Sequence, residues 1–137
     1  MRRVVRVPAY PFTPKSNRYL QPGQFWALPL STGRFACGRV MAVPAFGPTD
    51  RVGFFAGLMD WVGSDPPTHD SLEGAAVVTQ AKARFEAIAN TGGVVLGLRP
   101  LELDGLLAII PGHAVGAVSR VWGWHAIVDE AEKLAAR

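Results

Sequence analysis

Asp65, His69 and Glu73 resemble a set of metal ligands more than any other group of side chains in the sequence. They stand four residues apart, and on a helix that spacing would place possible metal ligands on one face. Pro66 and Pro67 fall inside the segment, however, and proline does not fit the interior of a helix. The sequence therefore predicts a solvated acidic loop at this position and no metal site.

Groups that could support catalysis are poorly arranged as well. Cys37 has apolar neighbours, as a buried inert thiol does. The chain holds neither a Gly-x-Ser-x-Gly nucleophile motif nor a glycine loop for phosphates. Glu102 with Asp104, and Asp129 with Glu130, are carboxylate pairs that we interpret as a surface turn and the first turn of a helix. We therefore expect no enzymatic activity, no catalytic residue and no cofactor.

Trp26 could stack on a nucleic-acid base, because Arg34 and Arg39 are near it in the sequence and could meet phosphates. Strand alternation, however, places Trp26 with Leu28 and Leu30 on one face, as in a hydrophobic core. We favour the core interpretation. A non-catalytic nucleic-acid-binding module that uses Trp26 and the basic N-terminal arm remains an alternative.

Composition indicates one β-rich domain. The chain has 137 residues, of which 49% are hydrophobic and 18% charged, with 15 glycines and 11 prolines. So many turn-forming residues with so few charges favour short strands over a helical bundle. The single cysteine cannot form an internal disulfide, which is typical of a cytoplasmic protein. No apolar run approaches the roughly 20 residues of a membrane-spanning helix, so we expect no membrane contact.

Charge is unevenly distributed along the chain. Residues 1–49 hold seven Lys/Arg and no acid, whereas residues 50–81 hold one Arg and five acids. Near the N-terminus Arg2, Arg3 and Arg6 alternate with valines, which predicts a solvated arm or an edge strand. Such a basic arm could also meet phosphates or an acidic protein.

Hydrophobic periodicity predicts strands over residues 24–30, 34–43, 51–61, 94–101 and 114–124. Ser31-Thr32-Gly33 has the length and the glycine of a three-residue hairpin loop. Pro29 cannot donate to a sheet ladder, so it predicts an edge position or a bulge, and Gly38 predicts a bulge or a close backbone approach.

The remaining segments differ in how clearly they predict a structure. Residues 77–89 fit both a strand and a helix, and we favour a strand to Ala83 followed by one or two helical turns. Residues 106–110 fit a short buried strand or a helical turn. Residues 125–137 form the clearest helix, with early acids, late basic residues and one apolar face, formed by Ile127, Ala131 and Leu134.

These elements predict an α+β fold: a strongly bent, mainly antiparallel sheet, or a small barrel-like sheet, with a C-terminal helix. One domain covers residues 1–137. Residues 1–19 form the basic arm or edge strand, residues 20–102 the main body, and residues 103–137 the last strand and the helix.

Two stretches resemble the bacterial immunity protein 26 family. The stretch "PGQFWALPLSTGRFACGRV" is similar to a hairpin of the form GD-x-F-A-I-PL-x-x-G-x-x-x-x-G-x-V that begins the family domain. The stretch "TGGVVLGLRPL" is similar to a later G-x-W-x-x-x-G-x-x-PL segment. The resemblance covers residues 20–102, which would form an immunity-like core. It rests on glycines, prolines and apolar residues that specify a fold, namely Gly23, Phe25, Ala27, Pro29, Leu30, Gly33, Gly38, Val40, Gly93, Gly97, Pro100 and Leu101.

The resemblance implies a cytoplasmic immunity protein that binds and neutralises the cognate protein toxin of a bacterial polymorphic toxin system. The exposed surface would then carry the function. Many toxin domains are nucleases with basic clefts, and an acidic patch can block such a cleft. The carboxylates concentrated in residues 60–73 are our candidate partner-binding residues, namely Asp60, Asp65, Asp70 and Glu73.

An enzyme is the alternative from another functional class. A small twisted barrel that opens with a hairpin is similar in outline to the PemK-type endoribonuclease toxins. That activity would need an arginine with a Thr or Ser at the barrel mouth, for which Arg39 and Thr49 are the nearby candidates.

Overall fold

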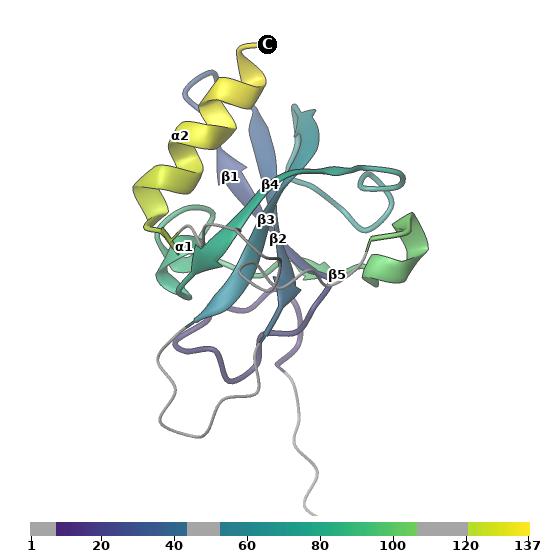
Figure 1. Ribbon diagram of the computed structural model, residues 1–137, viewed down its shortest axis with the longest axis vertical. Helices are drawn as coiled ribbons and strands as arrows, with labels where there is room; N and C mark the ends of the chain where they lie inside the picture. Colours follow the sequence, from purple (N-terminus) through teal and green to yellow (C-terminus); the bar gives the residue numbers. More distant parts are fainter. Residues whose placement is uncertain (1–7, 44–52, 107–120) are drawn as a thin grey trace, which may run out of the picture.

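The computed structural model describes residues 8–43, 53–106 and 121–137. Within these ranges the strands form one sheet in the order β5-β1-β2-β3-β4-β6, and helix α2 packs against it (Figure 1). The strands are β1 (Gln24–Pro29), β2 (Phe35–Ala42), β3 (Phe54–Gly63), β4 (Val77–Ala83), β5 (Gly97–Leu98) and β6 (Val121–Trp122). The helices are α1 (Glu86–Ala89), α2 (Trp124–Ala135) and a 3-10 turn, η1 (Leu101–Asp104).

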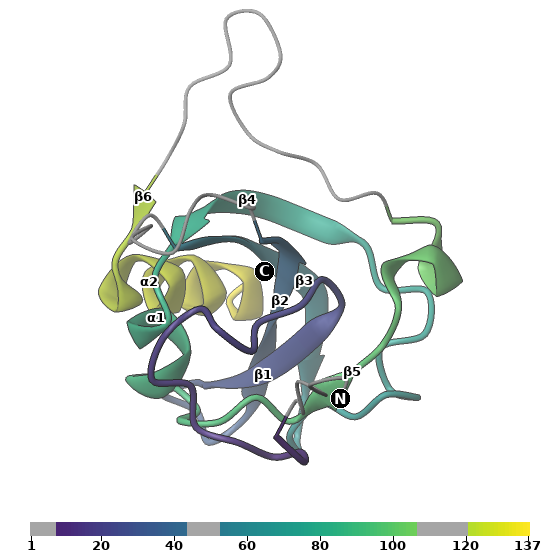
Figure 2. The ribbon, with the colours of Figure 1, turned by 90° about the horizontal axis from the view of Figure 1, so that it is seen from below.

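The sheet confirms the expected fold class. Among the described strands, β5, β1, β2, β3 and β4 pair antiparallel in that order, and the short β6 pairs parallel with β4. The sheet is strongly bent but open, with β5 and β6 as its edges (Figure 2). None of the helices in the described ranges has the length and apolar character that a membrane span requires.

The β1–β2 hairpin forms as expected. Leu30 N donates to Arg34 O at 2.9 Å, which closes a three-residue loop, and Gly33 takes a φ of +84°. The register shifts on the β2–β3 side between Ala36 and Gly38. Gly38 lies opposite Trp26, and any Cβ at Gly38 would overlap the indole ring. The close approach at Gly38 is therefore made by a side chain and not by another backbone.

Pro29 ends β1 on a locally free edge. Strand β5 pairs only with Gln24 and Phe25, so at Pro29 that side of β1 has no strand partner among the described residues. The missing N–H of proline therefore costs no ladder hydrogen bond there.

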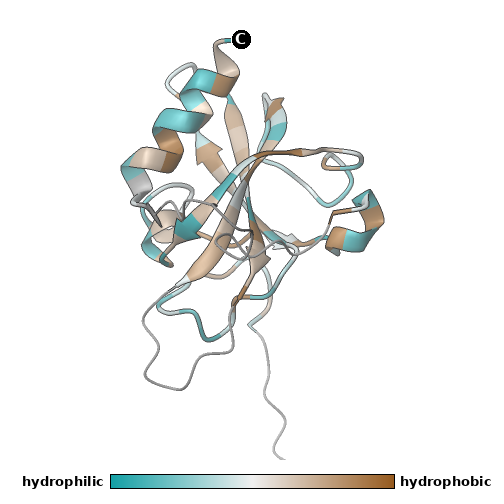
Figure 3. Ribbon diagram, in the orientation of Figure 1, coloured by the Kyte–Doolittle hydropathy of each residue, from teal (hydrophilic) through white to brown (hydrophobic). Residues whose placement is uncertain are grey.

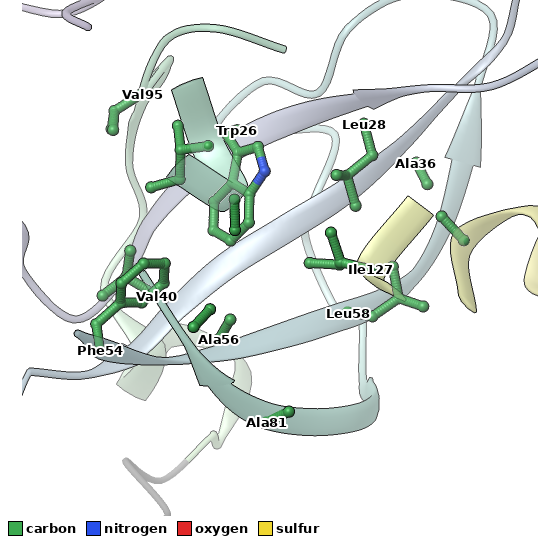
Figure 4. Packing of buried hydrophobic residues seen from close by; sticks show 14 of the residues in the cluster. Trp26, Leu28, Ala36, Val40, Phe54, Ala56, Leu58, Ala81, Val95 and Ile127 are labelled. Carbon is green, nitrogen blue, oxygen red and sulfur yellow. The ribbon is translucent and has the colours of Figure 1, made fainter. Parts of the chain in front are cut away.

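One face of the sheet packs against α2. Trp26 and Phe54 meet edge to face with ring centroids 6.0 Å apart, and both are fully buried, which supports the core interpretation of Trp26 (Figure 4). The apolar face of α2 completes this cluster through Ile127, Ala131 and Leu134, as expected from their spacing. The expectation that Asp129 and Glu130 stand in the first turn is wrong, because the helix begins at Trp124 and its first turn holds no acid. Along α2 hydrophilic and hydrophobic residues alternate (Figure 3). The helix also meets the hairpin, because Ser31 N donates to Glu132 Oε1 at 3.1 Å.

Two expectations about strand lengths need correction. The strand predicted over residues 94–101 is limited to β5, because Val95 exchanges backbone hydrogen bonds with Phe12 and the chain turns into η1 after Pro100. Strand β3 extends to Gly63, two residues beyond the predicted end. Residues 77–89 form β4 followed by the single turn α1, as favoured from the sequence.

Several sequence expectations lie outside the described residues. These are the alternation of Arg2, Arg3 and Arg6, the start of the third strand at residues 51–52, the segment 106–110 beyond Leu106, and the part of the last predicted strand before Val121.

Replacing Gly33 tests the hairpin turn. Gly33→Val is expected to lower the free energy of unfolding by about 1 kcal/mol or more, because a β-branched residue does not readily adopt positive φ. No described atom lies within 4 Å of the position that a Cβ would take, so backbone strain alone should cause the loss. Urea unfolding measures it. Gly33→Asn is the control, since asparagine tolerates positive φ, and a valine variant as stable as the parent would contradict the turn.

Candidate functional site

The loop between β3 and β4, residues 64–76 (the acidic loop), folds back over the sheet. At its base Asp60 N donates to Ala76 O at 2.7 Å. Leu72 is fully buried and packs with Phe25, Cys37 and Met59. Figures 1 and 2 show α2 on one side of the sheet and this loop, together with η1, on the other. The acidic loop and η1 thus cover the face that α2 leaves free.

Short-range hydrogen bonds fix the middle of the acidic loop. Thr68 N donates to Ser71 Oγ at 2.8 Å, and Ser71 N donates to Thr68 Oγ1 at 3.1 Å. These reciprocal bonds close one turn directly after Pro66 and Pro67, whose φ angles are restricted. The turn therefore has little freedom to rearrange.

A buried charge cluster joins the acidic loop to the sheet. Asp104 at the end of η1 accepts two hydrogen bonds from Arg99, from Nε to Oδ2 and from Nη2 to Oδ1, each at 2.8 Å. Arg39 of β2 places Nη1 3.7 Å from Asp104 Oδ2. The side chains of Arg39, Arg99 and Asp104 are 0%, 8% and 1% exposed. We call these three residues the arginine–aspartate cluster.

The cluster also binds backbone groups on three segments. Arg39 donates from Nε to Gly23 O at 3.3 Å and from Nη2 to Arg99 O. Arg99 Nη1 donates to His69 O at 3.1 Å, and Gly74 N donates to Asp104 Oδ1 at 2.9 Å. Strand β2, the segment from β5 to η1 and the acidic loop are therefore held at one point.

The pKa values in the cluster follow from these contacts. Hydrogen bonds from Arg99 hold the pKa of Asp104 well below its ordinary value. The same carboxylate raises the pKa of Arg99, and the nearby charges of Glu73 and Asp70 add to this effect. Burial lowers the pKa of Arg39, which the charge of Asp104 partly offsets. Asp104 is therefore the anion that makes burial of the two guanidinium groups tolerable.

Asp104 corrects one interpretation of the sequence. The pair Glu102 and Asp104 was expected to be a surface turn, and only Glu102 is exposed. The reason is spatial, because η1 turns the Asp104 carboxylate toward Arg39, 65 positions earlier in the sequence. One signal was available in the sequence. Arg39 stands in a run of otherwise apolar residues of β2, and a charge buried in a strand needs a partner.

The candidate partner-binding carboxylates are all exposed. Asp65, Asp70 and Glu73 share the acidic loop, and Asp70 Oδ1 lies 3.0 Å from His69 Nδ1. Asp60 stands apart on β3, and no described contact joins its side chain to the other three. Among the residues that the structure describes, no three side chains of His, Cys, Asp and Glu come together in a group that could hold a metal ion.

An open groove of about 620 Å³ borders the acidic loop. Its floor is mainly apolar and comes from β1 and the β5 edge, while Tyr10 stands at one side. Asp65, Thr68 and His69 supply its polar groups. The complete lining consists of Tyr10, Phe25, Asp65, Pro66, Pro67, Thr68, His69, Leu96, Gly97 and Leu98.

The residues of the family-like motif have structural surroundings. Gly23 has a φ of +99°, and a Cβ there would lie 2.7 Å from Arg99 O. A Cβ on Gly97 would come within 3.0 Å of the Phe25 ring. Val40 is fully buried, and Pro100 precedes η1. Gly23 thus allows the backbone of Arg99 to approach beside the cluster, and Gly97 allows the Phe25 ring to approach beside the groove.

The alternative sites have different surroundings. Arg39 is fully buried and hydrogen-bonds two backbone carbonyl groups beside Asp104, which does not fit a side chain that meets an RNA phosphate. Thr49 lies outside the described residues. Trp26 is fully buried and presents no face for a base to stack on. Burial also raises the pKa of the Cys37 thiol, which disfavours a reactive thiolate.

Comparisons with known proteins provide no relative to guide the assignment: no family model matches the chain, and no curated protein or solved structure matches it significantly. The resemblance to the bacterial immunity protein 26 family therefore rests on the quoted residues alone.

Replacing Asp104 tests the arginine–aspartate cluster. Asp104→Asn is expected to lower the free energy of unfolding by about 3 kcal/mol at pH 7, because two buried guanidinium groups lose their counter-charge. Glu102→Gln removes an exposed carboxylate from the same turn and should change stability by less than about 0.5 kcal/mol. Urea unfolding measures both. An equal loss of unfolding free energy in the two variants would contradict a stabilising role of the cluster.

The pH dependence of the same comparison tests the charge of Asp104. Its folded-state pKa lies below the ordinary value of 3.8, so the carboxylate stabilises the fold above pH 3.8. That contribution is lost as the pH falls through the folded-state pKa. The stability difference between wild type and Asp104→Asn should thus be complete at pH 7 and shrink in acid. A difference that does not change with pH would show that packing, and not charge, carries the effect.

Proposed function

We propose that this chain is a non-catalytic immunity-type protein that binds and neutralises a bacterial toxin domain in the cytoplasm. The observation that carries the proposal is the acidic loop, whose exposed carboxylates stand on a backbone fixed by a buried cluster. A fixed loop loses little conformational entropy on docking. Its charge would speed encounter with a basic partner.

The charges near the loop support a basic partner. The acidic loop contains Asp65, Asp70 and Glu73 and no Lys or Arg. Behind it, the arginine–aspartate cluster holds two positive charges and one negative charge, which leaves one excess positive charge. Three exposed acids against one buried excess charge leave this surface negative. A toxin nuclease with a basic cleft would be complementary to it.

Neutralising the acidic loop tests the proposal. The variant Asp65→Asn, Asp70→Asn and Glu73→Gln is expected to slow association with the toxin domain encoded beside the gene by about tenfold or more at low salt, because charge steering is lost. Surface plasmon resonance at two salt concentrations measures the rate. Asp60→Asn is made separately, since Asp60 stands apart from the loop.

A matched control removes the same number of acids elsewhere. Glu86→Gln, Asp129→Asn and Glu130→Gln change the net charge equally but lie on α1 and α2. This control should leave the association rate nearly unchanged. Equal slowing by both triple variants would mean that net charge matters and the acidic loop is not the docking site. No binding and no protection by the wild-type chain in co-expression would contradict the immunity function itself.

The enzyme alternative has its own test. We expect the purified protein to cleave neither RNA nor DNA, with or without Mg²⁺, because the arginine named for that chemistry is buried. Gel analysis of labelled RNA measures cleavage. Metal-stimulated cleavage by the wild type that disappears in a folded Arg39→Lys variant would contradict the binding function and favour a ribonuclease.

A further inference from the structure

The groove beside the acidic loop combines an apolar floor with one carboxylate at its rim. Leu96 and Leu98 are half-buried, and Pro66 is exposed, so apolar surface faces the open space. Asp65 is the acid among the lining residues. This combination suits a side chain that is apolar along its length and positive at its end.

We propose that this groove binds an arginine side chain, carried by an extended segment of the partner protein. The inference rests on the proposed function and adds to it the kind of residue that the partner supplies. The aliphatic part of the arginine would lie against Leu96, Leu98 and Pro66. Its guanidinium would reach the Asp65 carboxylate, and the Tyr10 ring offers a face for stacking.

The neighbouring charges fit a cation and not an anion. Asp65 lines the groove, and Asp70 and Glu73 are exposed on the same loop. Arg99 is the nearest described cation to the loop, but it does not line the groove. Its three nitrogens already donate to Asp104 and His69. The guanidinium of Arg99 is therefore already bound within the protein, whereas the acids of the loop face the solvent.

The floor of the groove is held in place before any ligand binds. Gln24 beneath it is fully buried and donates from Nε2 to Tyr10 Oη at 3.3 Å and to Tyr19 O at 2.9 Å, which positions the tyrosine. Arg99 Nη1 holds the backbone of His69, which also lines the groove. Both walls are thus tied to buried groups, and little reorganisation is needed on binding.

Short peptides with one variable residue test this inference without the toxin. The probe is acetyl-Ser-Val-Arg-Val-Ser-amide, and its counterpart carries citrulline, which has the shape of arginine but no charge. Amide chemical shifts of the labelled protein are followed during titration. We expect saturable shifts at Thr68, His69, Gly97 and Leu98 with the arginine peptide. The affinity for the citrulline peptide should be lower by about tenfold or more.

Two variants locate the binding. Asp65→Asn and Tyr10→Ser should each weaken binding of the arginine peptide several-fold. Asp129→Asn removes another exposed acid, from α2, and should leave the affinity unchanged. Equal affinity for the arginine and citrulline peptides, shifts elsewhere on the protein, or full affinity in Asp65→Asn would overturn the inference.

The outcome is separable from that of the proposed function. A toxin that is neutralised normally by Asp65→Asn and Tyr10→Ser would overturn the arginine groove but leave the immunity function standing. Specific arginine binding by a chain that protects against no neighbouring toxin would overturn the immunity function but leave the arginine groove standing.

Discussion

Asp104 forms ion pairs with two buried arginines, Arg39 and Arg99. A guanidinium that leaves water without a counter-charge is strongly unfavourable. The chain can therefore bury Arg39 in β2 only if η1 brings Asp104 to it. Once there, Asp104 also holds Arg99 and the Gly74 amide. One carboxylate thereby joins the sheet, the segment after β5 and the acidic loop.

This arrangement explains why the two faces of the sheet are covered so differently. On one face α2 supplies a continuous apolar side, and packing alone can hold it. On the other face lie a loop and a single 3-10 turn, with Leu72 and Leu101 as their buried apolar anchors. Irregular segments with few apolar contacts open easily, so polar contacts to buried groups must hold them. The consequence is an acidic surface that is exposed and yet fixed in position.

Local patterns were sufficient to predict the hairpin and α2. The turn depends on Gly33 and its neighbours, and the helix depends on the spacing of Ile127, Ala131 and Leu134, so nothing distant had to be known. The charge cluster could not be predicted in this way, because Arg39 and Asp104 are far apart in the sequence and meet only after η1 forms. The shortness of β5 was missed for the same reason, since Phe12 competes for Val95. The groove depends on Tyr10, the acidic loop and β5 meeting, and no local pattern reports such a meeting.

If the arginine–aspartate cluster fixes the acidic loop in place, amide hydrogen exchange in the loop should differ between wild type and Asp104→Asn. Exchange is compared at Gly74 and Ala75 in the loop and at Ala56 and Leu58 in β3, under conditions where both proteins are folded. We expect the loop amides to lose far more protection than the β3 amides in the variant. Equal loss at both places, or unchanged protection in the loop, would contradict it.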